Sequence, residues 1–155
     1  MGWLLDTNLL LRFADTAAPE HLTARTAIEA LVGRGEEVYL TTQNFIEFWA
    51  VATRPPEANG LGWSVSDAEA RVRSLKLRFL FLADTEAIFD EWLRLVSSLQ
   101  IKGKRAHDAR LRAVMSVHGI SNLLTFNTED FSSFPNITIA HPNDILGGQT
   151  SSAVQ

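Results

Sequence analysis

Short apolar runs alternate with longer helical patterns along most of the chain. The runs that have the length of buried strands are 3–5, 38–41, 79–82, 122–125 and 137–139. Between them lie segments whose apolar residues recur every three or four positions, as at Ala24, Ala27, Ile28 and Leu31. Because parallel strands need long crossover connections, this rhythm is typical of an α/β protein. The sequence therefore predicts a central sheet of four or five parallel strands with helices on both faces.

Composition narrows the class of protein further. The chain has 155 residues, enough for one domain, and its 46% hydrophobic and 21% charged residues are typical of a globular protein. It has no cysteine, which excludes a disulfide framework, a catalytic thiolate and a sulfur-bound metal centre. No apolar stretch approaches the length of a membrane span and the N-terminus does not resemble a signal peptide, so we expect a cytoplasmic protein without a membrane partner. The expected organisation is one domain over 1–146 and a flexible polar tail over 147–155.

Acidic residues stand where such a sheet binds ligands, beyond the carboxyl ends of its strands. Asp6 follows the first apolar run directly, and Asp108 lies in the first turn of a late predicted helix. Asn127 and Asp130 follow the penultimate run. Each acid also has a structural interpretation, because carboxylates commonly cap helices and stabilise turns. For any one of them alone, that interpretation is the commoner one.

Glu47 is harder to explain as a structural residue. It lies within the aromatic and aliphatic run 45–49, and no Lys or Arg lies one helical turn away. A buried carboxylate needs a cation or a proton. If Asp6, Asp108 and Asp130 converge on Glu47, their repulsion calls for a divalent cation, and oxygen ligands favour Mg²⁺ or Mn²⁺. Such a site is suited to metal-dependent cleavage of phosphodiester bonds.

Four segments carry a recognisable pattern: LLDTN at 4–8, NFIE at 44–47, AHDA at 106–109 and LTFNTEDF at 124–131. In this order and spacing they resemble the signature blocks of PIN-domain nucleases, and within that family the VapC-type toxins of bacterial toxin–antitoxin pairs. The resemblance covers residues 1–146. It implies a PIN-like fold and an endoribonuclease that depends on Mg²⁺ or Mn²⁺, forms a homodimer and is silenced by a cognate antitoxin.

The resemblance also implies roles for particular residues. The three core acids, which are catalytic and bind the metal, and the two polar residues that support them are Asp6, Glu47 and Asp108, with Asn8 and Thr125. The fourth acidic position is different, because many relatives have an aspartate where this chain has Asn127. Two alternatives follow. Either Asp130 takes the catalytic and metal-binding part of the fourth acid, or Asn127 remains in that place and a second metal binds weakly.

A basic segment lies beside Asp108. Residues 102–112 contain five Lys or Arg and one acid, although the chain as a whole has a net charge of −4. A positive rim next to an acidic pocket would bind the phosphates of an RNA substrate, whereas the alternative is an ordinary solvated helix face. The candidate RNA-binding residues are Lys102, Lys104, Arg105, His107 and Arg110.

Three other functions remain open. A PIN fold that has lost catalysis could act as a nucleic-acid or protein-binding module, which Asn127 favours and the three core acids oppose. An aspartate-based phosphatase of the haloacid dehalogenase type could use Asp6 as its nucleophile, but it needs a second acid where Asn8 stands. A response-regulator receiver would need paired acids near the first strand and a lysine after a late strand, and the segment 124–126 offers no lysine.

Overall fold

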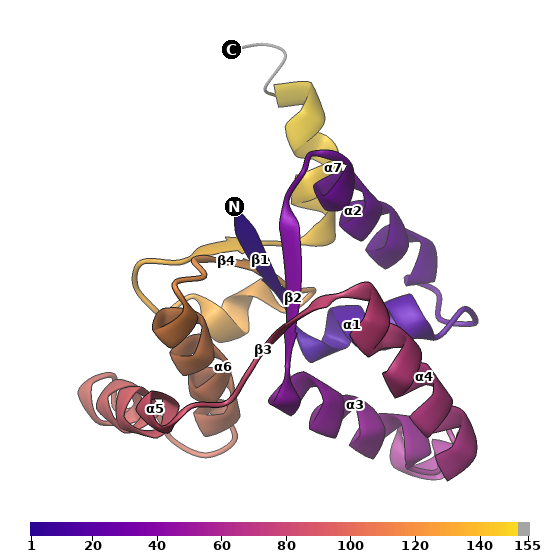
Figure 1. Ribbon diagram of the computed structural model, residues 1–155, viewed down its shortest axis with the longest axis horizontal. Coiled ribbons are helices and arrows are strands. Elements are labelled where there is room, and N and C mark those ends of the chain that lie inside the picture. Colours follow the sequence, from indigo (N-terminus) through magenta and orange to yellow (C-terminus); the bar gives the residue numbers. More distant parts are fainter. Residues whose placement is uncertain (152–155) are drawn as a thin grey trace.

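The computed structural model describes residues 1–151 and contains a five-stranded parallel sheet in the order β3-β2-β1-β4-β5 (Figure 1). The strands are β1 (Gly2–Leu5), β2 (Glu37–Thr41), β3 (Leu80–Leu82), β4 (Asn122–Leu124) and β5 (Thr138–Ala140). The chain builds outward from β1 to β3 and then returns to the other side of β1 with β4. This reversal makes the carboxyl ends of β1 and β4 the place where a ligand site is expected. The predicted α/β architecture is confirmed.

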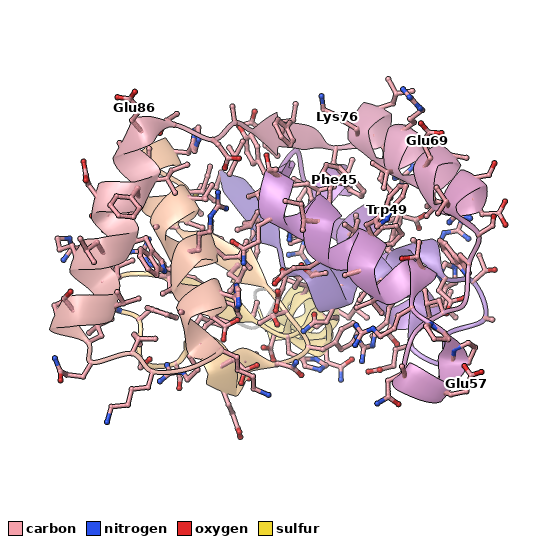
Figure 2. The ribbon with its side chains drawn as sticks, turned by 90° about the horizontal axis from the view of Figure 1, so that it is seen from below. Phe45, Trp49, Glu57, Glu69, Lys76 and Glu86 are labelled. Atoms are coloured by element: carbon pink, nitrogen blue, oxygen red, sulfur yellow. The ribbon has the colours of Figure 1, made fainter. Side chains whose placement is uncertain are left out.

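Helices cover both faces of the sheet, as the sequence predicts. They are α1 (Thr7–Ala14), α2 (His21–Gly33), α3 (Thr42–Thr53), α4 (Val65–Arg78), α5 (Glu86–Ser98), α6 (Arg105–His118) and α7 (Pro142–Ser151), with short 3₁₀ turns at Pro56–Ala58 and Thr128–Phe131. On one face α2 packs against α1 and α7, and on the other α5 packs against α6 (Figure 1). The order α5, α6, α3, α4 across the molecule is visible from below in Figure 2.

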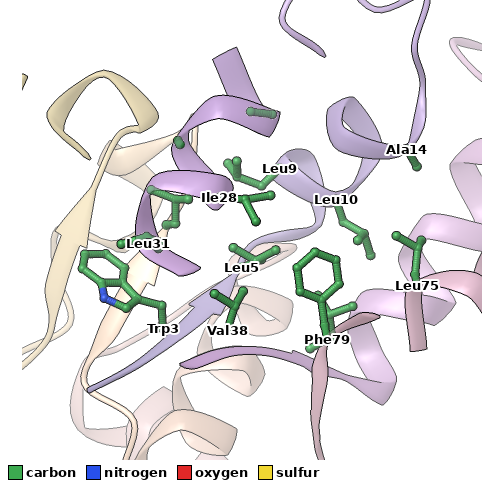
Figure 3. Close-up of a cluster of buried hydrophobic side chains, with 14 of the residues drawn as sticks. Trp3, Leu5, Leu9, Leu10, Ala14, Ile28, Leu31, Val38, Leu75 and Phe79 are labelled. Carbon is green, nitrogen blue, oxygen red and sulfur yellow. The ribbon is translucent and has the colours of Figure 1, made fainter. Parts of the chain in front are cut away.

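The strand β1 divides its side chains between two cores. Successive residues of a strand point to opposite faces, so Trp3 and Leu5 pack with Ile28 and Leu31 of α2 (Figure 3), whereas Leu4 packs in the second core beneath α5 and α6. All five side chains are buried. Because β1 is buried on both faces, its position is fixed, and so is that of Asp6, which follows it.

The segment 79–82 differs from its prediction as a buried strand. β3 pairs only with β2, so it is an edge strand, and its Leu80 and Phe81 are 47% and 38% exposed. Phe79, which precedes β3, and Leu82, its last residue, are buried. An apolar run alone does not distinguish a central strand from an edge strand that carries exposed apolar residues.

The first part of the predicted C-terminal tail belongs to a helix. The helix α7 continues through Ser151 and therefore covers residues 147–151, which were predicted as the start of a flexible tail. α7 packs against α2, and the Arg34 guanidinium donates a hydrogen bond to the Ile145 carbonyl. This packing outweighs the low helix propensity of the glycines. The remainder of the predicted tail, 152–155, lies outside the described residues. Within 1–151, no helix has both the length and the hydropathy needed to cross a membrane.

Candidate active site

Asp6 lies at the point where the strand order reverses. Its backbone N–H continues the β1–β4 ladder by donating to the Leu124 carbonyl at 2.9 Å. Its side chain then caps α1, because Oδ1 accepts a hydrogen bond from the Thr7 N–H at 2.8 Å. The structural interpretation of Asp6 as a helix cap is therefore correct for one carboxylate oxygen. The second oxygen faces a different set of partners.

Two polar side chains hold that second oxygen. Thr125, directly after β4, donates its hydroxyl to Asp6 Oδ2 at 2.8 Å, and Asn8 donates its amide to the same atom at 3.2 Å. Asn8 also contacts the Thr125 hydroxyl at 3.2 Å and accepts from the Phe126 N–H at 3.2 Å. The structure thus places both predicted supporting residues in contact with the carboxylate of Asp6, which is fixed from three directions.

Glu47 reaches the same place from the first turns of α3. Its Oε1 accepts a hydrogen bond from the Thr7 hydroxyl at 2.8 Å, and Thr7 is itself the neighbour of Asp6. The buried Asn44 amide donates to the Leu5 carbonyl at 3.0 Å and contacts the Thr7 hydroxyl at 3.3 Å. Thr7 and Asn44 therefore position Glu47 relative to β1. Sequence analysis assigned neither residue a role.

The local sequence explains why Asn44 is so placed. Thr41 ends β2 and caps α3, and it forms a reciprocal capping box with Asn44 at the third helical position. The Thr-x-x-Asn spacing is the sequence signal for this arrangement. The box sets the direction in which α3 leaves the sheet, and Glu47 lies three residues farther along the helix.

Asp108 approaches from the opposite side, in the first turn of α6. Its carboxylate accepts no hydrogen bond from any described residue. The position of this turn is instead set by Gln43 of α3, whose buried side chain donates to the His107 carbonyl at 2.8 Å and contacts the Arg110 guanidinium at 3.2 Å. Gln43 is a further positioning residue that sequence analysis missed.

Burial raises the pKa of Asp6 to about 6. The hydrogen bonds from Thr125 and Thr7 act in the opposite direction and lower the pKa, while the charges of Glu47 and Asp130 raise it further. A carboxylate held by three donors would otherwise have a low pKa. The raised value shows that desolvation outweighs hydrogen bonding at this position.

Burial likewise raises the pKa of Asp108 to about 6, with repulsion from Asp6, Asp130 and Glu47 adding to the effect and Arg105 opposing it. The charges of Glu47 and Asp130 therefore act on both Asp6 and Asp108. None of the ion pairs among the described residues includes any of them. The pocket thus concentrates negative charge that no protein cation pairs with directly.

Comparison with known proteins decides the family. The family model that describes the PIN domain matches residues 3–137 of this chain. The chain belongs to the PIN domain family. A curated relative, ribonuclease VapC24 of Mycobacterium tuberculosis, is 27% identical over 135 residues, which cover 84% of this chain and 89% of the relative.

Solved structures share the fold of this PIN domain. VapBC2 from Rickettsia felis, bound to a DNA fragment from its promoter, gives a TM-score of 0.69 at 13% identity, over 91% of this chain and 98% of that one. VapBC-1 from nontypeable Haemophilus influenzae gives 0.68 at 14% identity, over 92% and 99%. VapC20 of M. tuberculosis, a toxin that cleaves the sarcin–ricin loop, gives 0.59 at 18% identity, over 88% and 98%. The PIN-like fold expected from the sequence is confirmed.

The two candidates for the fourth acidic residue lie just after β4. Asn127 and Asp130 are both exposed there. Asp130 repels Asp6 and Asp108 and so lies close enough to act on both. Asn127 contributes through its backbone, since its N–H donates to the Thr125 hydroxyl at 3.0 Å. The structure therefore brings the charge of Asp130 to the acids.

The basic residues predicted to bind RNA lie on the loop before α6 and on its first turns: Lys102, Lys104, Arg105, His107 and Arg110. Lys102, Lys104 and His107 are exposed. Arg105 donates to the Ser133 hydroxyl and lowers the pKa of Asp108, which places it beside the acids. Arg110 donates to Asp84 at 2.9 Å.

Arg112 is different from the other bases of this segment. Its guanidinium donates to the Pro135 carbonyl, and burial lowers its pKa. The charged groups that influence it are Glu91 and Arg94 of α5 rather than the acids. The positive rim therefore ends before Arg112.

A cavity of about 440 Å³ opens beside Glu47. It is lined by Gln43 and Ile46 of α3 and by His107 and Arg110 of α6. A carboxylate and a guanidinium thus face one space between two helices. Such a cavity can admit a phosphate-bearing chain next to the acids.

Proposed function

We propose that this PIN domain is a metal-dependent endoribonuclease and the toxin of a VapC-type toxin–antitoxin pair. The observation that carries the proposal is the mutual repulsion of acids from separate elements, because Glu47 and Asp130 raise the pKa values of Asp6 and Asp108 and none of the four forms an ion pair among the described residues. The similarity to ribonuclease VapC24 supports RNA as the substrate. The basic rim before and along α6 supports a polyanionic ligand.

Mg²⁺ or Mn²⁺ is the proposed cofactor. Within the described residues, no three His, Asp or Glu side chains are grouped closely enough to hold a metal ion as they stand. The donor chemistry nevertheless fits a hard divalent cation, because all the candidate ligands are oxygens and their charges repel one another. The proposed ligands are Asp6, Glu47 and Asp108, with Asp130 or Asn127 as a further contact. Such an ion, when bound, activates water and stabilises the leaving oxygen.

The protein's own residues prepare this chemistry. Thr125 and Asn8 hold one oxygen of Asp6 and keep the other on the α1 cap, so the carboxylate has one orientation. Thr7 orients Glu47 in the same way. Lys104 and Arg105 are the residues proposed to bind the phosphates that flank the cleaved bond, because Lys104 is exposed and Arg105 lowers the pKa of Asp108. Positioning of this kind commonly contributes 10- to 100-fold to metal affinity or activity, by order of magnitude.

The proposed partners are a cognate antitoxin and a second copy of the chain, in the cytoplasm. A groove between α3, α4 and β3 supports such contacts, because its lining is mainly apolar and includes Ile46 and Phe81, which are 64% and 38% exposed. Figure 2 shows Phe45 and Trp49 on the side of α3 that is turned towards α4. Exposed apolar surfaces of this kind commonly form protein interfaces.

The test of the proposal is cleavage of single-stranded RNA by the purified chain. We expect cleavage in Mg²⁺ or Mn²⁺, none in EDTA, and at least about a 100-fold loss in Asp108→Asn. Asp90→Asn is the matched control, since Asp90 is an exposed acid of α5 outside the pocket. Cleavage that continues in EDTA, or undiminished in Asp108→Asn, contradicts the proposal.

A catalytically weak binding module is the second candidate. The exposed Asn127 and the absence of a closely grouped ligand set among the described residues favour it. It predicts RNA or protein binding by the wild type without cleavage in any divalent cation. The phosphatase alternative is disfavoured, because the residue two positions after Asp6 is Asn8, an amide that donates to Asp6 rather than an acid that could transfer a proton.

A further inference from the structure

A second cavity, of about 430 Å³, lies between α5 and α6. Ile88, Phe89 and Trp92 of α5 line one wall, and Ala106, His107 and Arg110 of α6 line the other. The α5 wall is apolar and mostly aromatic, whereas the α6 wall carries the polar groups. None of the α5 residues has a part in the chemistry proposed above.

This cavity adjoins the one beside Glu47. His107 and Arg110 line both spaces, so they stand between the acids and the aromatic wall. The Arg110 guanidinium is fixed there by hydrogen bonds to Asp84 at 2.9 Å and to Gln43 at 3.2 Å. The aromatic wall is therefore within reach of a chain that is bound in the cavity beside Glu47.

The aromatic wall is exposed yet ordered. Phe89 is 62% exposed, and its ring lies 5.9 Å from that of Trp92, with the two planes inclined at 39°. Trp92 is held by a hydrogen bond from its indole N–H to the Ala106 carbonyl at 2.9 Å. A fixed indole next to an exposed phenyl ring offers a stacking surface that the protein itself does not fill.

We propose that this cavity binds the base of a nucleotide adjacent to the cleaved bond in single-stranded RNA. Sites for single-stranded nucleic acid combine aromatic rings, on which bases stack, with cations that follow the backbone. Phe89 and Trp92 provide the rings, and Arg110 with the exposed His107 provides the polar edge next to the acids. The proposal rests on the proposed ribonuclease function, and it adds a second contact for the substrate.

The test combines a protein variant with a modified RNA. Phe89→Ala removes an exposed ring, and Leu93→Ala is the matched control because Leu93 is 47% exposed on the same helix but does not line the cavity. Binding is measured with Asp108→Asn as the background, so that the RNA is not cleaved, and kcat/KM is measured with Asp108 intact. The RNAs are one oligonucleotide and a set in which an abasic site replaces one base at a time near the cleaved bond.

Phe89→Ala should weaken binding of the intact RNA by about 10-fold or more, as expected for the loss of one stacked base, while Leu93→Ala leaves it unchanged. One abasic position should weaken wild-type binding by a similar factor. At that position Phe89→Ala should cause no further loss, because the ring and the base then form one interaction. The effect on kcat/KM should follow the effect on binding.

Three results overturn the proposal: binding within twofold of wild type in Phe89→Ala, additive losses at every abasic position, or a change of oligomeric state in Phe89→Ala by light scattering, which assigns the wall to a second copy.

The ribonuclease proposal fails separately. If the wild type binds RNA in a way that depends on Phe89 but cleaves none, the base-binding proposal stands and the ribonuclease proposal fails. If it binds no RNA, both proposals fall.

Discussion

The two sides of the acidic pocket are built differently. Asp6, on the strand side, receives hydrogen bonds from Thr7, Asn8 and Thr125, whereas Asp108, on the helix side, receives none from the described residues. Burial nevertheless raises both pKa values to about 6. The strand side is thus preorganised by the sheet, and the helix side is held only through the backbone of α6. If a cation binds at Asp6, as proposed, the Asp108 side chain has to move towards it before both can be ligands.

The largest effect expected is on catalysis. If both sides bind the same cation, Asp6→Asn and Asp108→Asn should each lower kcat/KM by about 100- to 1,000-fold, and the double variant should lose little more because the acids act as a unit. Steady-state cleavage of a fluorescent RNA measures this. A variant that keeps more than a tenth of wild-type activity would show that its side of the pocket is dispensable.

A smaller effect should distinguish the residues that position the two sides. Thr125→Val removes a hydroxyl that touches the Asp6 carboxylate, so Mn²⁺ affinity should fall by about 10- to 100-fold. Gln43→Leu acts on Asp108 indirectly, through the His107 carbonyl and the Arg110 guanidinium, and should cost less. Calorimetric titration with Mn²⁺ compares them, and a larger loss in Gln43→Leu would reverse the assignment of the ordered side.

The position of Asp6 could be predicted because it directly follows a strand, and strand ends of a parallel sheet meet at one edge. The supporting roles of Asn8 and Thr125 followed from the resemblance to PIN-domain nucleases. Thr7 and Gln43 were missed, since their partners lie on other elements and no local pattern identifies them. Asn44 was missed as well, although its capping-box spacing from Thr41 marks the start of α3. Their roles follow from how α3 and α6 pack. That packing is a property of the whole fold rather than of a short segment.

In the fold, too, some elements could be predicted from a short segment and others depend on packing. The central strands β1 and β4 are buried on both faces, and their apolar runs were sufficient to predict them. The exposed residues of β3 and the extent of α7 were not predictable, because both depend on neighbours. β3 has a partner strand on one side only, and α7 continues past its glycines where it packs against α2.

The free energy of unfolding of the metal-free protein should depend on pH because of Asp6 and Asp108. Their pKa values in the folded protein are about 6, above the usual value near 4. Protonation therefore favours the folded state. Stability should rise as pH falls from about 7 to about 4.5, by about 1–2 kcal/mol after allowance for solvent screening.

Urea unfolding in EDTA at several pH values measures this dependence, and Asp108→Asn should flatten it by removing one of the two titrating groups. The amide also relieves repulsion without breaking a hydrogen bond among the described residues, so its stability at pH 7 should exceed that of the wild type. A stability that falls steadily below pH 7 in the wild type would contradict the raised pKa values.

The smallest effect concerns the exposed turn after β4. Asp130→Ala should lower kcat/KM by about fivefold, as expected for an exposed charge, and Asn127→Ala should change it less, because Asn127 acts through its backbone N–H. Asn127→Asp should strengthen binding of a second metal ion if the turn faces the pocket. Equal losses in the two alanine variants would leave Asp130 without a particular role.

The most direct test of the account is the melting temperature of the metal-free protein with and without Mn²⁺. If the acids form one cation site, Mn²⁺ at 100 times its dissociation constant should stabilise the wild type by about 2.7 kcal/mol, which raises its melting temperature by about 5 °C or more. Asp6→Asn and Asp108→Asn should show almost no response, and Asp90→Asn should respond like the wild type. A wild type that does not respond to millimolar Mn²⁺, or an equal response in all four proteins, would contradict a shared metal site.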